Sequence, residues 1–173
     1  MQPNLNELLN DYNANFSNRS VEMTTNYKKI STIRIKMEEN NFPHLLGLHY
    51  CIHGKSATEL CKMIKSDQLG YEQIKKTQEF KAYNIKDRIG CYNYLGQFLY
   101  NAEGRVFYPT DNLKPNPMKL TLVFSERKGN GEVVLGVKRD IKQDCYRLAT
   151  LHYSRKQKYT NMRSSKILAT RWY

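Results

Sequence analysis

The most informative stretch of this chain reads Phe42-Pro43-His44-Leu45-Leu46-Gly47-Leu48-His49-Tyr50. Proline is tolerated in the first turn of a helix, where a backbone N–H would have no partner. The apolar residues around it predict a helix from Pro43 to about Ile52. This helix would present His44 near its N-terminus and His49 roughly 140° further round its axis. The stretch therefore predicts a helix with one histidine on each of two faces.

The sequence before and after this stretch reads as helices. Helical spacing of apolar residues predicts a short helix over 3–14, and a lysine-rich helix or helical turn is expected over 71–80. Ser56 and Glu59 have the spacing of a capping box and predict a helix start. Residues 85–100 carry apolar side chains at every third or fourth position and form the clearest core helix. One strand precedes them, over 30–37, where apolar and polar residues alternate.

Beyond residue 100 the apolar period changes from helical to two, which is typical of strands. Lys128-Gly129-Asn130-Gly131 predicts a tight hairpin turn, because asparagine and glycine accept positive φ. Five further strands are predicted, at Arg105–Tyr108, Leu120–Ser125, Val133–Lys138, Tyr146–Tyr153 and Lys166–Trp172. Helices followed by a meander predict an α+β fold with the helices on one face of an antiparallel sheet and the other face open. Residues 1–20 are expected to form a helix and linker, and residues 21–173 a single domain.

The charge balance indicates the class of partner. With 28 Lys and Arg against 16 Asp and Glu, the net charge is +12. This excess favours a polyanionic partner and argues against an acidic mimic of DNA, although a basic face can also serve only for solubility. The four cysteines show no zinc-site spacing, and no apolar run is long enough to cross a bilayer. The start of the chain has no apolar leader, so a cytoplasmic protein without membrane contact is expected.

Histidines supply the first catalytic candidates. His44 either caps a backbone carbonyl or acts as an acid or base kept neutral by the positive end of the helix dipole. His49 and His53 have the i, i+4 spacing of zinc ligands, but no glutamate lies between them as it does in zinc proteases. We therefore expect neither a metal nor another cofactor, and His44 is the preferred catalytic residue.

The stretch from Cys145 to Lys156 predicts a strand that ends in histidine, hydroxyls and cations. Transesterification of RNA needs a base for the 2′-hydroxyl, an acid for the leaving oxygen and cations around phosphorus. We assign the catalytic roles to His44, His152, Ser154 and Arg147. Cations and rings alternate where phosphates bind and bases stack, so the expected RNA-binding residues are Arg155, Lys156, Lys158, Tyr153 and Tyr159. The alternative is a charged strand edge with an incidental histidine.

The segment Asn41-Phe42-Pro43-His44-Leu45-Leu46-Gly47-Leu48, placed directly after a short strand, resembles the F-x-H-L-x-G helix signature of a nuclease family. This is the fourth family of phage-associated barnase–EndoU–colicin–RelE-like nucleases, and the resemblance extends over about residues 24–173. It implies helices packed on a curved antiparallel sheet of four to five strands, and RNase activity without a metal. His44 matches the family's helical histidine, whereas His152 and Ser154 match by their position late in the sheet.

Together these observations predict a metal-independent endoribonuclease of a phage or mobile element. Its partners would be RNA and an antitoxin, an immunity protein or a host nucleoprotein complex. The alternative is a non-catalytic phage protein that binds RNA or a host nucleoprotein complex, such as an inhibitor of a nucleic-acid-guided defence system. A catalytic site would require His44 and His152 to converge on one face of the sheet.

Overall fold

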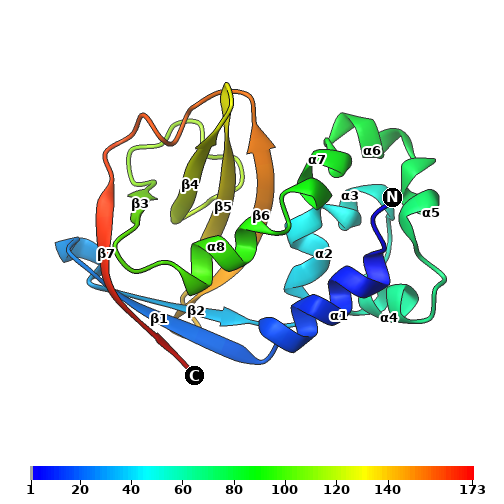
Figure 1. Ribbon diagram of the computed structural model, residues 1–173, viewed down its shortest axis with the longest axis horizontal. Coiled ribbons are helices and arrows are strands. Elements are labelled where there is room, and N and C mark those ends of the chain that lie inside the picture. Colours follow the sequence, from blue (N-terminus) through cyan, green and yellow to red (C-terminus); the bar gives the residue numbers. More distant parts are fainter. Residues whose placement is uncertain (1) are drawn as a thin grey trace.

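A closed barrel of seven strands dominates the computed structural model, which describes residues 2–173 (Figure 1). All neighbouring strands pair antiparallel except β2 and β6, which run parallel. In order around the barrel the strands are β1 (Arg19–Thr25), β2 (Thr32–Met37), β6 (Cys145–Ser154), β5 (Gly131–Asp140), β4 (Leu122–Lys128), β3 (Val106–Pro109) and β7 (Ser165–Trp172).

The predicted curved antiparallel sheet of four to five strands with an open face is wrong. The strands predicted after residue 100, and the one over 30–37, are present with small shifts at their ends. The predicted strands do not include β1, in which Val21, Met23 and Thr25 are buried and alternate with more exposed residues. Since β1 pairs with both β2 and β7, it joins the early strands to the last one and closes the barrel. Closure removes the free edges that an open sheet would have.

Inward-facing side chains from every strand fill the barrel as one hydrophobic core. The alternation of β2 puts Ile33, Ile35 and Met37 inside, and Phe124 of β4 meets Phe98 at 6.3 Å between ring centroids. Phe98 belongs to α8, which crosses in front of β5 in Figure 1. The core continues from the barrel into the helices through Phe42 and Tyr92. Barrel and helices therefore share one apolar interior.

The helices lie mostly to one side of the barrel, next to β6 (Figure 1). They are α1 (Leu5–Asn15), η1 (Lys28–Ile30), α2 (Asn41–Leu46), α3 (Leu48–Cys51), α4 (Ala57–Lys65), α5 (Tyr71–Lys75), α6 (Gln78–Ala82), α7 (Ile85–Gly90) and α8 (Tyr94–Tyr100), of which η1 is a 3₁₀ turn. The predicted capping box of Ser56 and Glu59 is present at the start of α4. Residues of α1 are buried in the same core as the barrel, and residues 19–20 belong to β1. The predicted boundary between an N-terminal segment and the main domain at residue 20 stays a prediction.

Three predicted helices are each broken into two, the one over 71–80 into α5 and α6. Gly47 adopts φ +71° and separates α2 from α3, and a Cβ there would lie 3.0 Å from Cδ1 of Ile85. Glycine is the residue that accepts this backbone conformation at no steric cost. The predicted helix over 85–100 is interrupted by a turn at residues 91–93, which separates α7 from α8. The break frees α7 to pack on β6 while α8 packs on β5.

The parallel pairing of β2 with β6 is short and leaves much of β6 unpaired on that side. It joins Ile35 to Tyr146 and Lys36 to Arg147. Beyond Arg147 the helices α2 and α7 pack against β6 instead. Along the line of contact between α7 and β6, Arg88 of α7 donates a hydrogen bond to Thr150 of β6.

Glycine at the start of β5 is required by close packing. A Cβ on Gly131 would overlap the carbonyl oxygen of Ser154 and lie 2.5 Å from the Tyr153 hydroxyl. We expect Gly131→Ala to lower the free energy of unfolding by about 1–3 kcal/mol, the usual cost of overpacking. Urea denaturation measures the effect. Gly90→Ala is the matched control, because a Cβ there meets nothing within 4 Å; an equal loss in both variants would contradict the packing argument.

Candidate functional site

His152 lies on the outward side of β6, where strand alternation places it with Thr150. In the neighbouring strand β5, Val134 pairs with His152 and Gly136 pairs with Thr150. Oγ1 of Thr150 is 3.1 Å from Nδ1 of His152, so the hydroxyl orients the imidazole. The second ring nitrogen, Nε2, is then available to a ligand.

Arg88 of α7 reaches this pair from the helical side. Its Nη1 donates to Oγ1 of Thr150 at 2.9 Å, and its Nε donates to the carbonyl of Tyr83 at 3.1 Å. Burial lowers the pKa of Arg88 below its ordinary value. Among residues 2–173 no carboxylate lies within 4.0 Å of its guanidinium nitrogens. Burial of a guanidinium without a carboxylate partner costs free energy, unless a bound anion balances its charge.

A row of four rings leads away from Arg88 along α2, α3 and the turn before α7. The centroids of His44 and His49 are 4.8 Å apart, those of His49 and Tyr50 4.0 Å, and those of Tyr50 and Tyr83 4.0 Å. The guanidinium of Arg88 lies 5.7 Å from the Tyr50 centroid. Nδ1 of His49 is buried and has no hydrogen-bond partner in residues 2–173. The row therefore connects His44, which is exposed, to the arginine beside His152.

We use the name histidine–arginine cluster for the residues His44, His49, Arg88, Thr150 and His152. Burial, followed by Arg88, lowers the pKa of His152 to about 4. Burial and then Lys138 lower the pKa of His44, and burial and then His44 lower that of His49. Each cause disfavours an added positive charge, so the rings stay neutral near pH 7 while Arg88 and Lys138 are charged. A bound phosphate would oppose these shifts.

The structure gives Arg147 and Ser154 other contacts. Nη1 of Arg147 is 2.8 Å from Oε2 of Glu38, and its Nε donates to Asp140 at 3.0 Å. Arg147 lies five residues from His152 along β6, about 16 Å in a strand. The hydroxyl of Ser154 donates to the carbonyl of Lys156 at 2.8 Å. His44 and His152 therefore stand at opposite ends of a chain of contacts through His49, Tyr50, Arg88 and Thr150. Arg147 lies apart from this chain, and Ser154 stabilises the turn after β6.

The expected RNA-binding residues separate into two groups. Tyr153 and Arg155 line a cleft that faces α7, and Lys156 is exposed beside them. Tyr159 is only 8% exposed and packs with Tyr108, Leu120, Val123 and Val134 on the outside of the barrel. Nζ of Lys158 lies 5.7 Å from the Tyr159 centroid. The ring of Tyr159 is therefore mostly covered, while the cations around it face solvent.

A buried carboxylate fixes the segment that carries these cations. Glu132 of β5 is fully buried and accepts hydrogen bonds from the backbone N–H groups of Tyr159 and Thr160, both at 2.9 Å. The hydroxyl of Ser125 donates to the same carboxylate at 3.0 Å. These bonds attach residues 159–160 to the barrel wall.

Among residues 2–173, no three His, Cys, Asp or Glu side chains are grouped as a metal site would need. Nε2 of His53 is 3.3 Å from Oε1 of Glu79, on the exposed helical surface. In the same part of the chain, every helix is too short or too polar to span a lipid bilayer.

Comparison with known families identifies the chain. The family model described as phage-Barnase-EndoU-ColicinE5/D-RelE like nuclease4 matches residues 4–169. The chain belongs to this family. Membership confirms the predicted resemblance and makes the protein one of a group of phage nuclease-like proteins. Searches of curated proteins and of solved structures gave no match.

The sequence reading of this nuclease-like chain did not select Arg88, His49 or Thr150 for the site. Arg88 lies between the buried Ile85 and Ile89 in the predicted core helix. A lone arginine between core positions is a weak signal, because its aliphatic stem can cover apolar surface. Only the packing of α7 on β6 shows that its head group meets Thr150.

The lowered pKa of His152 predicts a pH-dependent stability. Its ordinary value is 6.5 and its folded value about 4, so the unfolded chain binds a proton that the folded chain does not as pH falls from 6.5 toward 4. Stability is thus full above the unfolded pKa and declines through this window, by about 2 kcal/mol near pH 5. Urea denaturation at about pH 7.5 and about pH 5 should show a smaller loss for His152→Gln than for the wild type. His53→Gln is the exposed control; equal losses in all three proteins would contradict the prediction.

Proposed function

We propose that this protein is an endoribonuclease whose active site is the histidine–arginine cluster. Membership of the nuclease-like family supports phosphodiester cleavage as the reaction. The observation that carries the proposal is Arg88, a half-buried guanidinium that touches a histidine-bound hydroxyl and has no carboxylate within ion-pair distance in residues 2–173. The net charge of +12 supports a polyanionic substrate.

The proposed reaction is transesterification inside the RNA chain. Neutral His152 accepts the proton of the 2′-hydroxyl while the 2′-oxygen attacks phosphorus. The bond from phosphorus to the 5′-oxygen breaks, and that oxygen receives a proton from His44. The products are a 2′,3′-cyclic phosphate and a free 5′-hydroxyl. The two histidines thus act as base and acid in a single displacement.

The surrounding residues suit these roles. Thr150 contacts Nδ1 of His152 and so directs Nε2 toward the substrate. Arg88 and Lys138 supply positive charge for the non-bridging oxygens, where negative charge grows in the transition state. A phosphate near His44 would raise the pKa that burial and Lys138 lower, which favours the protonated ring required of an acid.

Cleavage assays with single-stranded RNA test the proposal. Cutting should persist in excess chelator, leave a 2′,3′-cyclic phosphate and stop when the scissile nucleotide lacks its 2′-hydroxyl. His44→Ala, His152→Ala and Arg88→Lys should each lower the rate about 100-fold or more, because each removes a proton-transfer or phosphate-binding group. Mass spectrometry of the product ends measures the outcome.

His53→Ala provides the matched control, because His53 lies outside the cluster and its side chain hydrogen-bonds only to Glu79 within residues 2–173. Cleavage that requires a divalent cation, or equal cutting of DNA, would contradict the transesterification mechanism. Tight RNA binding without any cutting would favour the second candidate, a non-catalytic protein that binds RNA or a nucleoprotein complex, which the basic charge also suits.

A further inference from the structure

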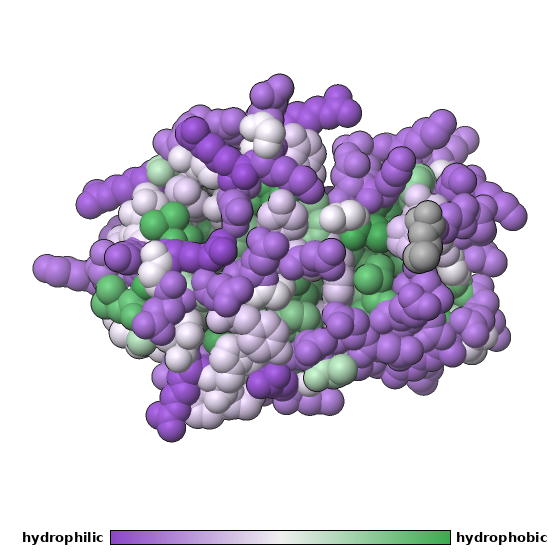
Figure 2. All heavy atoms as spheres, in the orientation of Figure 1, coloured by the Kyte–Doolittle hydropathy of each residue, from purple (hydrophilic) through white to green (hydrophobic). Residues whose placement is uncertain are grey.

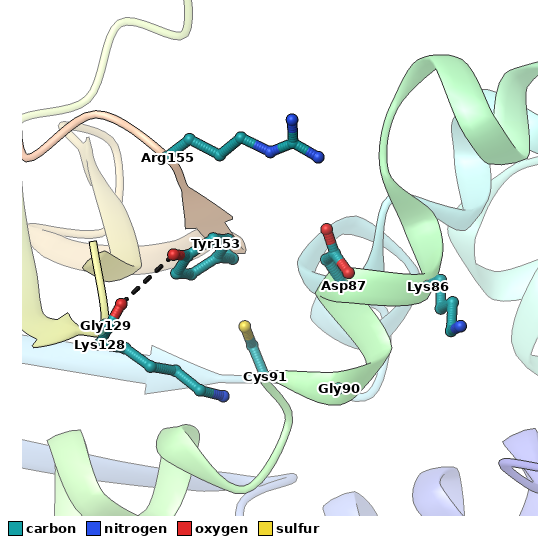
Figure 3. A pocket seen from close by; sticks show the side chains of 8 residues that line it. All are labelled: Lys86, Asp87, Gly90, Cys91, Lys128, Gly129, Tyr153 and Arg155. Carbon is teal, nitrogen blue, oxygen red and sulfur yellow. Dashed lines mark hydrogen bonds between the residues drawn. The ribbon is translucent and has the colours of Figure 1, made fainter. Parts of the chain in front are cut away.

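A cleft of about 520 Å³ opens between α7 and the end of β6 (Figure 3). The β4–β5 turn forms its third side through Lys128 and Gly129. In Figure 2 this face of the molecule is largely polar and is hollowed at its upper edge, between barrel and helices. The volume lies in the range of small-ligand sites in proteins.

The cleft has more positive charge than its own carboxylate balances. Lys86, Lys128 and Arg155 line it, and none of them pairs with a carboxylate within 4.0 Å in the described chain. In Figure 3, Arg155 extends from β6 across the opening toward α7. Phosphate is the anion that such a group of cations binds most readily in a protein with this net charge.

The cleft and the histidine–arginine cluster flank the same contact between α7 and β6. Asp87 lines the cleft, while the next residue, Arg88, reaches Thr150 in the cluster. Likewise Tyr153 lines the cleft and its neighbour His152 belongs to the cluster. An RNA strand that crosses this contact would reach both, since successive phosphates are spaced by a few ångströms along a single strand.

One wall of the cleft is a fixed aromatic ring. The hydroxyl of Tyr153 donates to the carbonyl of Lys128 at 3.3 Å, and glycine at position 131 leaves room for the phenol. A ring held in this way offers a surface on which an unpaired base can stack. The opposite wall carries Asp87, which points into the cleft in Figure 3 and has no ion pair within residues 2–173.

We propose that this cleft binds one unpaired guanine nucleotide, with Arg155 on its phosphate and Asp87 on its base. The proposal rests on the proposed function in that the nucleotide belongs to the substrate RNA. A carboxylate offers two adjacent acceptors, and guanine presents two adjacent donors, N1–H and the N2 amine. Adenine and cytosine place a ring acceptor beside their amine, and uracil places carbonyls on both sides of its N3–H. The carboxylate repels these acceptors, so it selects guanine.

Binding of nucleoside monophosphates tests the cleft without any cleavage step. By calorimetry, 5′-GMP should bind about tenfold or more tightly than 5′-IMP, which lacks the N2 amine, and than 5′-AMP. Asp87→Asn should remove most of this preference, because the amide nitrogen meets a guanine donor. Arg155→Ala should weaken all three nucleotides alike, since it changes only the phosphate contact. Glu103→Gln, which alters an exposed carboxylate outside the cleft, is the control.

The possible outcomes separate this proposal from the proposed function. A guanine preference that disappears in Asp87→Asn supports the cleft even where no RNA is cut. Equal binding of the three nucleotides by the wild type overturns it, whatever the cleavage assay shows. If Asp87→Asn strengthens the binding of all three nucleotides equally, the guanine proposal is also overturned. In that case Asp87 would act on Arg155 across the opening and not on the base. Thermal melting of each variant confirms that it is folded.

Discussion

The parallel pairing of β2 with β6 extends over only two residue pairs, yet the barrel would be open without it. Arg147 stands at this junction and binds Glu38, just after β2, and Asp140, at the end of β5. An arginine with two carboxylates holds three segments together, which explains its place at the point of closure. Beyond the junction, β6 has no strand on that side and α2 and α7 take its place.

Where α7 packs on β6 in place of a strand, the positive charge of Arg88 has no carboxylate partner in the described part of the chain. Arg147 is neutralised by two acids, whereas Arg88, on the same side of the barrel, meets only a carbonyl, a hydroxyl and a ring in the part of the chain that the structure describes. Within a protein an unbalanced cation lowers stability. Arg88 lies near His49 and His152 and, besides burial, helps to lower the pKa of both rings, which supports the proposal that a ligand supplies the missing anion.

The elements were largely predictable from sequence, but their assembly was not. Alternation in β2, the capping box at Ser56 and the turn at Gly129 are local signals, and each element formed as expected. Val21 and Met23 alternate equally well, yet the polar residues around them concealed β1, and barrel closure depends on that strand. His44 and His152 were predicted from the chemistry of histidine at a helix start and near a strand end, whereas the place of Arg88 in the candidate site depends on a contact with Thr150, 62 positions away. Barrel closure and the contact of Arg88 with Thr150 depend on packing between distant segments, which a local sequence pattern does not predict.

The bonds to Glu132 have a consequence for the cost of binding. Because two backbone N–H groups and the Ser125 hydroxyl hold this carboxylate inside the barrel wall, the segment after β6 is anchored before any ligand arrives. Binding to a disordered loop would spend part of its free energy on fixing the chain. Here that entropy has already been lost during folding, so the backbone next to the anchor is preorganised. If the proposed polyanion binds to this segment, its affinity would reflect charge and solvent release more than ordering of the backbone.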